Sequence, residues 1–222
     1  MNPDDEAPHR GQIDEWVFAA WVPDGSLGFV SGHRLLATHS WYWCAVVEAG
    51  RRLLHLTEWT VTVRSDPFII KAPAMWAEHQ CDEPMQQWSI GNEAYFVALD
   101  DPAEALDQAY GIPTALAIDA EWYAIGDALP LADSPSSQGY WQEGVVHGEI
   151  ELLHRPNHTF AEIPARRWRR WGESLGPLAT DHGPPPAGMP APFAFPDASA
   201  SQWTLTQAGW QAQEVSLKKF AR

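Results

Sequence analysis

Histidine and glutamate occur together at two places where they could exchange a proton with a bound molecule. Glu78 and His79 are neighbours on opposite faces of one predicted strand, and His147 shares a strand face with Glu143 and Glu149. Imidazole titrates near neutral pH, and a carboxylate beside it can orient it, so these residue types suit general acid–base catalysis. Hydration or cyclisation of an alkene is the chemistry they would serve, with a proton donor in a dry cavity walled by aromatic rings.

A fourth carboxylate, Glu93, lies in the middle of an apolar segment. Burying a carboxylate is costly unless it is paired, so Glu93 is either an acid with a raised pKa or part of a structural ion pair. The candidate catalytic residues are therefore His147, Glu93, His79 and Glu78. For each, a structural role is the commoner alternative: a hydrogen-bonded core histidine beside Cys81 for His79, and a solvated strand face for His147.

Aromatic residues are the main candidates for binding a ligand, because the chain has 13 Trp. Indole rings are large enough to shape a cavity, and their faces attract cationic groups. An arginine cluster from Arg166 to Arg170 could bind a carboxylate or phosphate, although pairing with the chain's own acidic residues is commoner. The predicted ligand-binding residues are Trp76, Trp88, Tyr95, Trp141, Trp43, Trp59 and Arg166.

Motifs for metals and cofactors are absent from the sequence. The two cysteines, Cys44 and Cys81, are not spaced as a zinc site or a disulfide framework. There is also no phosphate-cradling glycine loop, nucleophile elbow or metalloprotease helix. We therefore predict neither a metal nor a cofactor.

The charge balance excludes two classes of partner. The chain has 14 Lys and Arg against 29 Asp and Glu, for a net charge of -15. A field of that sign repels phosphate backbones and anionic lipids, so we predict no nucleic acid and no membrane. The polar, acidic start lacks the pattern of a signal peptide, and no segment has the ~18 consecutive apolar residues of a membrane span. These features predict a cytoplasmic protein.

The elements that position these residues are mostly strands. Short apolar segments between turn residues recur at regular intervals, which favours a sandwich or barrel; the first are 15–22, 27–36, 40–48 and 52–64. The only predicted helix begins with Asp101 and Pro102 and ends near Gly111. We divide the chain into a disordered lead-in (1–12), a β domain (13–172), and a proline-rich arm with closing strands (173–222). Within the arm, the many prolines of 173–201 predict an extended loop without packed elements.

Several motifs within 13–172 resemble a family of uncharacterised bacterial proteins related to carotenoid hydratase (hydroxyneurosporene synthase) and the lipocalin-like superfamily. They are Met75–Pro84, Trp88–Ala94, Val97–Pro102, Glu121–Trp122 and Val146–Glu149. The resemblance implies a lipocalin-like antiparallel barrel, usually one of two in tandem, and relatives that bind, hydrate or cyclise polyenes or terpenoids. This chain departs from the family in two ways. Arg166–Gly172 lacks an expected Asp and His, and only 50 residues follow Gly172.

Three functions agree with these observations. The first is binding of a small hydrophobic molecule of terpenoid, polyketide, steroid or acyl type in an aromatic-lined barrel pocket. The second is a cofactor-independent hydratase, isomerase or cyclase that acts on such a molecule by general acid–base catalysis. The third is a structural or assembly role in which the arm wraps a neighbouring subunit. A homodimer is compatible with all three.

Overall fold

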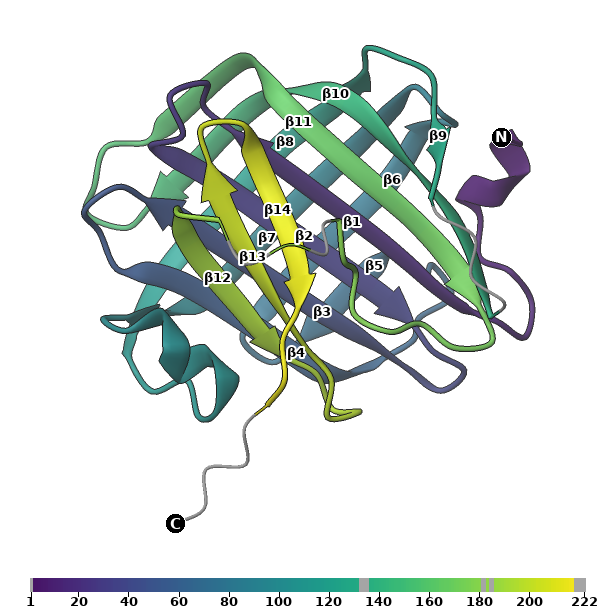
Figure 1. The fold of residues 1–222 in the computed structure, drawn as a ribbon, viewed down its shortest axis with the longest axis horizontal. Helices are drawn as coiled ribbons and strands as arrows, with labels where there is room; N and C mark the ends of the chain where they lie inside the picture. Colours follow the sequence, from purple (N-terminus) through teal and green to yellow (C-terminus); the bar gives the residue numbers. More distant parts are fainter. Residues whose placement is uncertain (1, 132–135, 181–182, 184–185, 218–222) are drawn as a thin grey trace.

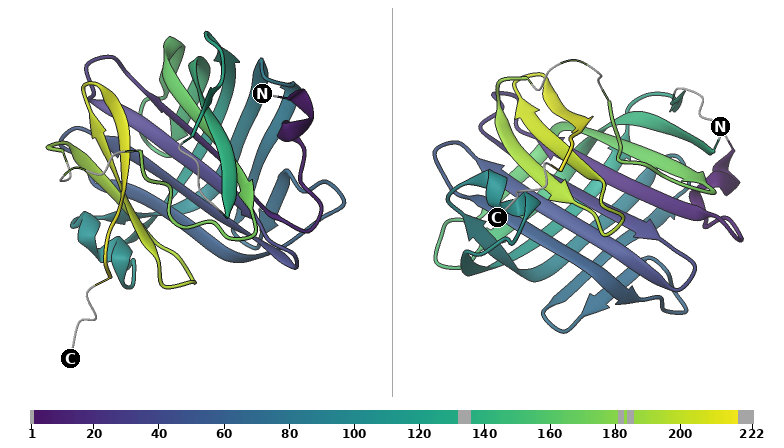
Figure 2. Two further views of the ribbon diagram at one scale, coloured as in Figure 1. Left: turned by 45° about the vertical axis from the view of Figure 1, so that its right-hand side comes forward. Right: turned by 60° about the horizontal axis from the view of Figure 1, so that its bottom comes forward.

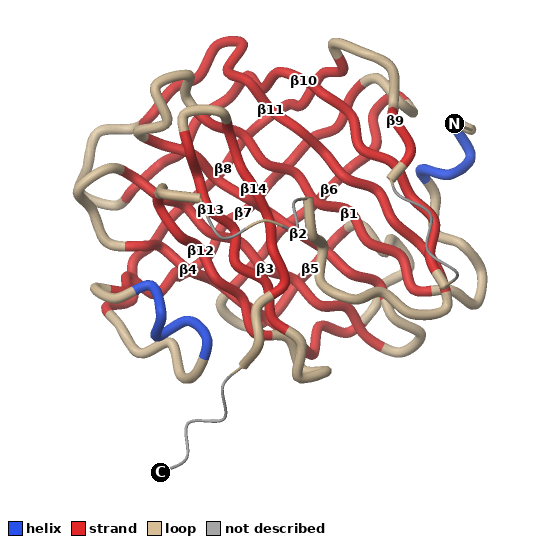
Figure 3. Tube along the Cα trace, in the orientation of Figure 1, coloured by secondary structure: helices blue, strands red, loops and turns tan. Residues whose placement is uncertain are grey.

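The computed structural model describes residues 2–131, 136–180, 183 and 186–217, and strands dominate it (Figure 3). In chain order, the first seven strands are β1 (Ile13–Trp21), β2 (Leu27–Leu35), β3 (His39–Glu48), β4 (Leu53–Thr62), β5 (Ile69–Ala72), β6 (Met75–Glu83) and β7 (Gln87–Leu99). The chain continues through β8 (Ile112–Ala124), β9 (Leu129–Pro130), β10 (Ser137–Leu152), β11 (His158–Gly172), β12 (Met189–Ala194), β13 (Ala200–Thr206) and β14 (Gly209–Glu214).

The large sheet closes into an antiparallel barrel (Figure 1). Within β1–β4 and within β5–β8 each strand pairs with the next, and β10 pairs with both β8 and β11. β11 returns to pair with almost the whole of β1, from Ile13 opposite Gly172 to Ala20 opposite Ala165. The ring closes where β4 pairs with β7, from Leu53 opposite Leu99 to His55 opposite Val97. Beyond this short ladder β4 and β7 diverge, and the β5–β6 hairpin extends the sheet from β7. The predicted all-β, barrel-type fold is confirmed.

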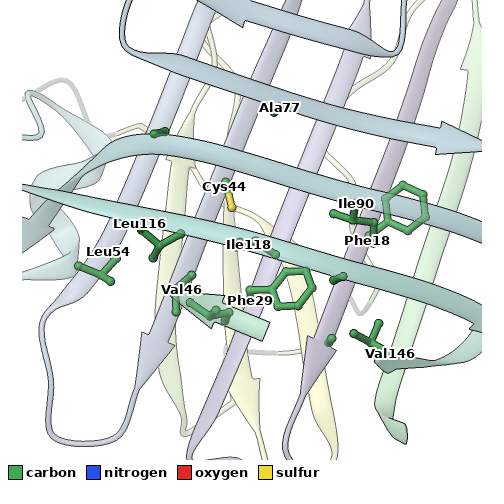
Figure 4. Close-up of a cluster of buried hydrophobic side chains, with 14 of the residues drawn as sticks. Phe18, Phe29, Cys44, Val46, Leu54, Ala77, Ile90, Leu116, Ile118 and Val146 are labelled. Atoms are coloured by element: carbon green, nitrogen blue, oxygen red, sulfur yellow. The ribbon is translucent and has the colours of Figure 1, made fainter. Parts of the chain in front are cut away.

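Alternation along the strands separates the interior from the outer face. In β7, Trp88, Ile90, Asn92, Ala94 and Phe96 are buried, whereas the residues between them are half-buried or exposed. The inward-facing apolar residues form one continuous core, part of which Figure 4 shows around Cys44, Phe29 and Ile118. Trp122 lies so close over Gly144 that a Cβ atom there would come within 2.3 Å of the indole.

A second, three-stranded sheet covers the outside of the barrel (Figure 2). It consists of β12, β13 and β14, and its apolar face packs on the outward-facing residues of β1–β3. This outer core includes Trp43, Trp168, Trp203 and Trp210, all almost completely buried. The strands β12–β14 therefore cover the protein's own barrel.

The proline-rich arm differs from its prediction as an extended, unpacked loop. Residues 189–194 form β12, with Ala191 and Phe193 fully buried. β12 pairs only with β13, and an edge strand tolerates Pro190 and Pro192 because one side needs no backbone donors. Within the predicted arm, residues 181, 182, 184, 185 and 218–222 lie outside the described part of the chain.

The predicted disordered lead-in also differs. Pro3–Glu6 form a 3-10 helix capped by Asn2, and the Glu6 side chain is buried. The predicted helix after Asp101 is a second 3-10 helix, Pro102–Leu106, which begins as expected because the Asp101 carboxylate accepts the Ala103 N–H at 2.9 Å. Neither of these helices, nor any other in the described residues, is long and apolar enough to cross a bilayer.

The two-layer arrangement predicts a large cost for removing an indole from the outer core. Trp203 is 1% exposed and contacts Trp168 edge-on, with ring centroids 5.2 Å apart. We expect Trp203→Ala to lower the free energy of unfolding by about 3–5 kcal/mol, because the cavity cannot collapse between two sheets. Urea unfolding measures this, with Trp76→Ala at a half-buried indole as the control. An equal loss in both variants would contradict tight packing between the layers.

Candidate functional site

A chain of hydrogen bonds crosses the apolar interior of the barrel. The Asn92 amide nitrogen donates to the Tyr42 hydroxyl at 2.8 Å, and this hydroxyl lies 3.0 Å from the Ser31 Oγ. Ser31 Oγ in turn lies 2.8 Å from Nε2 of His79. His33 is next to the chain, with its ring centroid 6.1 Å from that of His79. We call these five residues the interior polar cluster.

The strand alternation and register bring the interior polar cluster together. Ser31 and His33 are successive inward positions of β2, and His33 is opposite Tyr42 of β3. The β6–β7 hairpin contributes the other side, with His79 opposite Ile90 and Asn92 opposite Ala77. Closing the sheet into a ring places these two pairs of strands across the interior from each other.

One arrangement of the hydrogen bonds gives every hydroxyl proton an oxygen or nitrogen acceptor. If Asn92 donates to Tyr42, Tyr42 donates to Ser31 and Ser31 donates to Nε2 of His79, each hydroxyl proton has such an acceptor. The reverse arrangement would leave the Tyr42 proton with only the weakly accepting Cys44 sulfur, because the Tyr42 oxygen would then receive two donors. The first arrangement leaves the proton of His79 on Nδ1.

Four buried polar atoms of the cluster have no partner. They are Nδ1 and Nε2 of His33, Nδ1 of His79 and Oδ1 of Asn92, on side chains that are at most 1% exposed. An unpaired buried polar group costs about 1–3 kcal/mol, and native interiors hold few of them. Their concentration in one place marks it as a site for polar atoms that do not belong to the chain.

Burial keeps the cluster uncharged. It lowers the pKa of His33 to about 3, with Arg169 lowering it further and Glu15 acting in the opposite direction. Burial also holds the pKa of His79 well below its usual value, and His33 adds to this effect. The same desolvation raises the pKa of the Cys44 thiol to about 12 and that of Tyr42 well above its usual range. Near neutral pH both histidines are therefore neutral.

Ion pairs seal one end of the barrel beneath the N-terminal segment. Arg167 binds the Glu6 carboxylate, with one contact of 2.9 Å, and its guanidinium lies over the rings of Trp88, Trp122 and Tyr140. The neighbouring Arg169 binds Asp14 and donates to the Asp5 carbonyl at 2.8 Å. All four charged side chains in these two pairs are at most 3% exposed.

The arginine cluster therefore pairs with the protein's own acidic residues, which was the commoner of its two predicted roles. Arg170 shares Glu15 with Arg34 on the outer face, each through a contact of 2.8 Å. Arg166, predicted to bind a ligand, pairs with Glu143 and lies 4.9 Å from the centre of the Trp141 ring.

The opposite end of the barrel is hollowed at the surface. β11 pairs with β1 only as far as Ala165 opposite Ala20, and the β10–β11 hairpin continues beyond it. A hollow of about 480 Å³ lies between this hairpin and the β1–β2 turn, and the core residues Leu27 and Phe160 are among its lining. On the other side of the hairpin, a hollow of about 690 Å³ contacts Leu116.

One ion pair holds the hairpin over this end. Arg155, in the β10–β11 turn, binds Glu48 at the end of β3, and His158 Nε2 lies 3.8 Å from the same carboxylate. These side chains are 23–29% exposed, unlike the buried pairs at the sealed end. The two hollows at this end are not lined by any residue of the interior polar cluster. A molecule that enters here reaches the cluster only if side chains move.

The predicted catalytic residues do not form one site. His79 is fully buried in the interior, but Glu78, Glu93 and His147 lie on the outer face. Burial raises the pKa of Glu78, and the negative charges of Asp82, Asp66 and Asp119 raise it further. His147 lies opposite Glu121 in the β8–β10 ladder and contacts the Tyr123 ring edge-on. The roles assigned to these residues remain predictions.

The predicted ligand-binding residues are also dispersed. Trp88 is the one of the seven that faces the interior, where it is fully buried and its Nε1 has no partner. Trp43 and Trp59 belong to the outer core beneath the second sheet, and Trp141 packs against its edge. The other two aromatic residues, Trp76 and Tyr95, line surface hollows of about 310 and 690 Å³.

Sequence reasoning missed four members of the interior polar cluster: Ser31, His33, Tyr42 and Asn92. Asn92 carried a signal, because it is an uncharged polar residue at an inward position of an apolar strand. The neighbouring Glu93 drew attention instead, although its side chain points outward and is exposed. No group of three or more His, Cys, Asp or Glu in the described ranges is placed to hold a metal ion.

Comparisons with known proteins identify no family for this chain. No family model matches it, and no curated protein matches it. Among solved structures it is similar to CghA crystallised with Sch210972, with a TM-score of 0.41 and 10% identity, and to CghA alone, with a TM-score of 0.40 and 10% identity. Both comparisons cover 87% of this chain and 53% of the other, so the chain spans about half their length. The resemblance to carotenoid hydratase remains a prediction.

Neutral buried histidines predict a loss of stability in mild acid. His55 lies between the barrel and the second sheet, with Nε2 3.0 Å from the Pro192 carbonyl, and burial lowers its pKa to about 4. The unfolded chain binds a proton near pH 6.5 that the folded protein excludes, so the free energy of unfolding falls as pH drops from 6.5 towards 4. We expect His55→Gln to reduce this loss by about 2 kcal/mol between pH 7 and 5.

Chemical unfolding at several pH values measures this effect. The control is His147→Gln on the outer face, which should follow the wild-type pH profile. Parallel profiles for His55→Gln and the wild type would contradict a neutral, desolvated His55.

The partly exposed ion pair between Arg155 and Glu48 predicts that a molecule reaches the interior past the β10–β11 hairpin. Cys44 faces the interior and is fully buried, so its reaction with methyl methanethiosulfonate reports access when Cys81 is replaced by serine. We expect Arg155→Gln to raise the labelling rate of Cys44 several-fold at an unchanged urea midpoint, because it frees the hairpin. Arg52→Gln removes the exposed ion pair with Asp100 and is the control. Labelling that follows only global unfolding would exclude this route.

Proposed function

We propose that this protein binds a small, mostly apolar molecule inside the barrel, with the interior polar cluster as its recognition site. The observation that carries the proposal is the set of four unpartnered polar atoms on His33, His79 and Asn92. An eight-stranded ring encloses an interior large enough for side chains or one small ligand. The apolar walls around the cluster suit a hydrophobic molecule of terpenoid, polyketide, steroid or acyl type.

The proposal requires the interior to rearrange at its hollowed end. Phe29, Phe96 and Phe160 are part of the interior core, and neither of the two hollows at this end is lined by a residue of the cluster. Aromatic side chains at the end of a strand can change rotamer at modest cost, and ligand burial offsets this cost through apolar area removed from water. The sealed end is less suited to opening, because that would expose buried ion pairs.

Mass spectrometry of an organic extract of the purified protein tests the proposal directly. We expect a stoichiometric apolar molecule in the wild-type extract and a reduced yield from His33→Phe, in which two of the unpartnered atoms are removed. His147→Gln is the control and should retain the molecule. An empty wild-type extract, together with no change in melting temperature across a panel of apolar ligands, would contradict the binding function.

One contact favours a second candidate function, acid–base catalysis on the bound molecule. Ser31 Oγ lies 2.8 Å from Nε2 of His79, and Nδ1 of His79 is free to act on a ligand. A neutral imidazole N–H can polarise a carbonyl or supply a proton. If His79 acts chemically, His79→Gln should retain a different molecule from the wild type, namely the unconverted substrate. The same molecule in both extracts would support binding alone.

A further inference from the structure

We propose that the bound molecule carries an uncharged oxygen group, a hydroxyl or a carbonyl, that pairs with His79, His33 and Asn92. This inference rests on the proposed function and names the chemistry that the site selects. It predicts that a matching hydrocarbon binds less tightly, and that a matching carboxylate is excluded. The argument follows from the free donors and acceptors and from the charges around the cluster.

The free atoms offer both donors and acceptors. In the arrangement that gives every hydroxyl proton an oxygen or nitrogen acceptor, His79 presents its Nδ1–H as a donor and Asn92 presents Oδ1 as an acceptor. Neutral His33 adds one donor and one acceptor, since a neutral imidazole has one of each. A hydroxyl can accept from His79 and donate to Asn92 or His33. A carbonyl can accept from His79 and from the N–H of His33.

A hydrocarbon offers neither a donor nor an acceptor. If it filled the interior it would displace any water from the cluster and leave all four polar atoms unpaired. An unpaired buried polar atom is costly, so one hydrogen bond to a ligand oxygen is worth on the order of tenfold in affinity. The site therefore discriminates by the oxygen that the apolar molecule carries.

A carboxylate lacks a counter-charge in the cluster. The arginines near the interior are Arg167 and Arg169, and both already bind buried carboxylates at the sealed end. The cluster itself consists of Ser, Tyr, Asn and two neutral His. An unpaired buried carboxylate is costly, and pairing it with His33 or His79 would require that histidine to take up a proton. Any binding of an acid should therefore strengthen as pH falls, whereas binding of an alcohol should not.

Three probes with one carbon skeleton test this selectivity: farnesol, farnesoic acid and farnesene. Calorimetric or Trp-fluorescence titration at pH 8 should give the tightest binding for farnesol, on the order of tenfold weaker binding for farnesene, and no saturable binding for farnesoic acid. In Asn92→Leu and His33→Phe, the preference for farnesol over farnesene should shrink. His147→Gln, on the outer face, should keep it.

The outcomes separate the inference from the proposed function. Equal affinity for farnesol and farnesene, or farnesoic acid binding as tightly as farnesol, would overturn the inference and leave small-molecule binding intact. Failure of all three probes, with an empty organic extract, would overturn both. The melting temperatures of Asn92→Leu and His33→Phe show whether these two variants are folded. We expect His33→Phe to equal or exceed the wild-type value, since it replaces an unpaired buried side chain with an apolar one, and Asn92→Leu to melt somewhat lower, because it also removes the hydrogen bond to Tyr42.

Discussion

The rest of the structure depends on the closure of the sheet where β4 meets β7. Three residue pairs, from Leu53–Leu99 to His55–Val97, complete a ring of hydrogen-bonded strands. Closure removes the sheet edges along this ladder, and it also encloses an interior within the ring of strands. Every polar atom that points inward must then find its partner within the ring. The interior polar cluster is informative because it does not fully meet this requirement.

Ion pairs determine which end of this interior is closed. A buried arginine–carboxylate pair is rarely a net gain in stability, because desolvation offsets the attraction between the charges. Breaking one is nevertheless costly, since the remaining partner is left as an uncompensated buried charge. The pairs of Arg167 with Glu6 and of Arg169 with Asp14 therefore resist opening at the sealed end. The Arg155–Glu48 pair is partly solvated, so its opening costs less.

Local patterns in the sequence were sufficient for the fold class and for the faces of many strands. Alternation correctly placed Glu78 and His79 on opposite faces of one strand, and turn residues marked most strand ends. Patterns of this kind carry no information about which strands meet across the barrel. That is why Ser31 and His79, 48 positions apart, could not be recognised as partners. The N-terminal segment was missed for a similar reason, because its anchor, Arg167, lies 161 positions away.

The abundance of tryptophan was a weaker guide to the site than polarity in the interior. Two cores share these residues: Trp16, Trp88 and Trp122 are in the barrel, whereas Trp43, Trp168, Trp203 and Trp210 lie beneath the second sheet. An indole suits either environment equally well, so the number of Trp residues predicts extensive burial without locating a pocket. A polar side chain at an inward position is more selective, because its burial has a cost that something must offset. In a closed barrel, the inward-facing His, Asn, Ser and Tyr therefore identify the functional interior more directly than its aromatic walls.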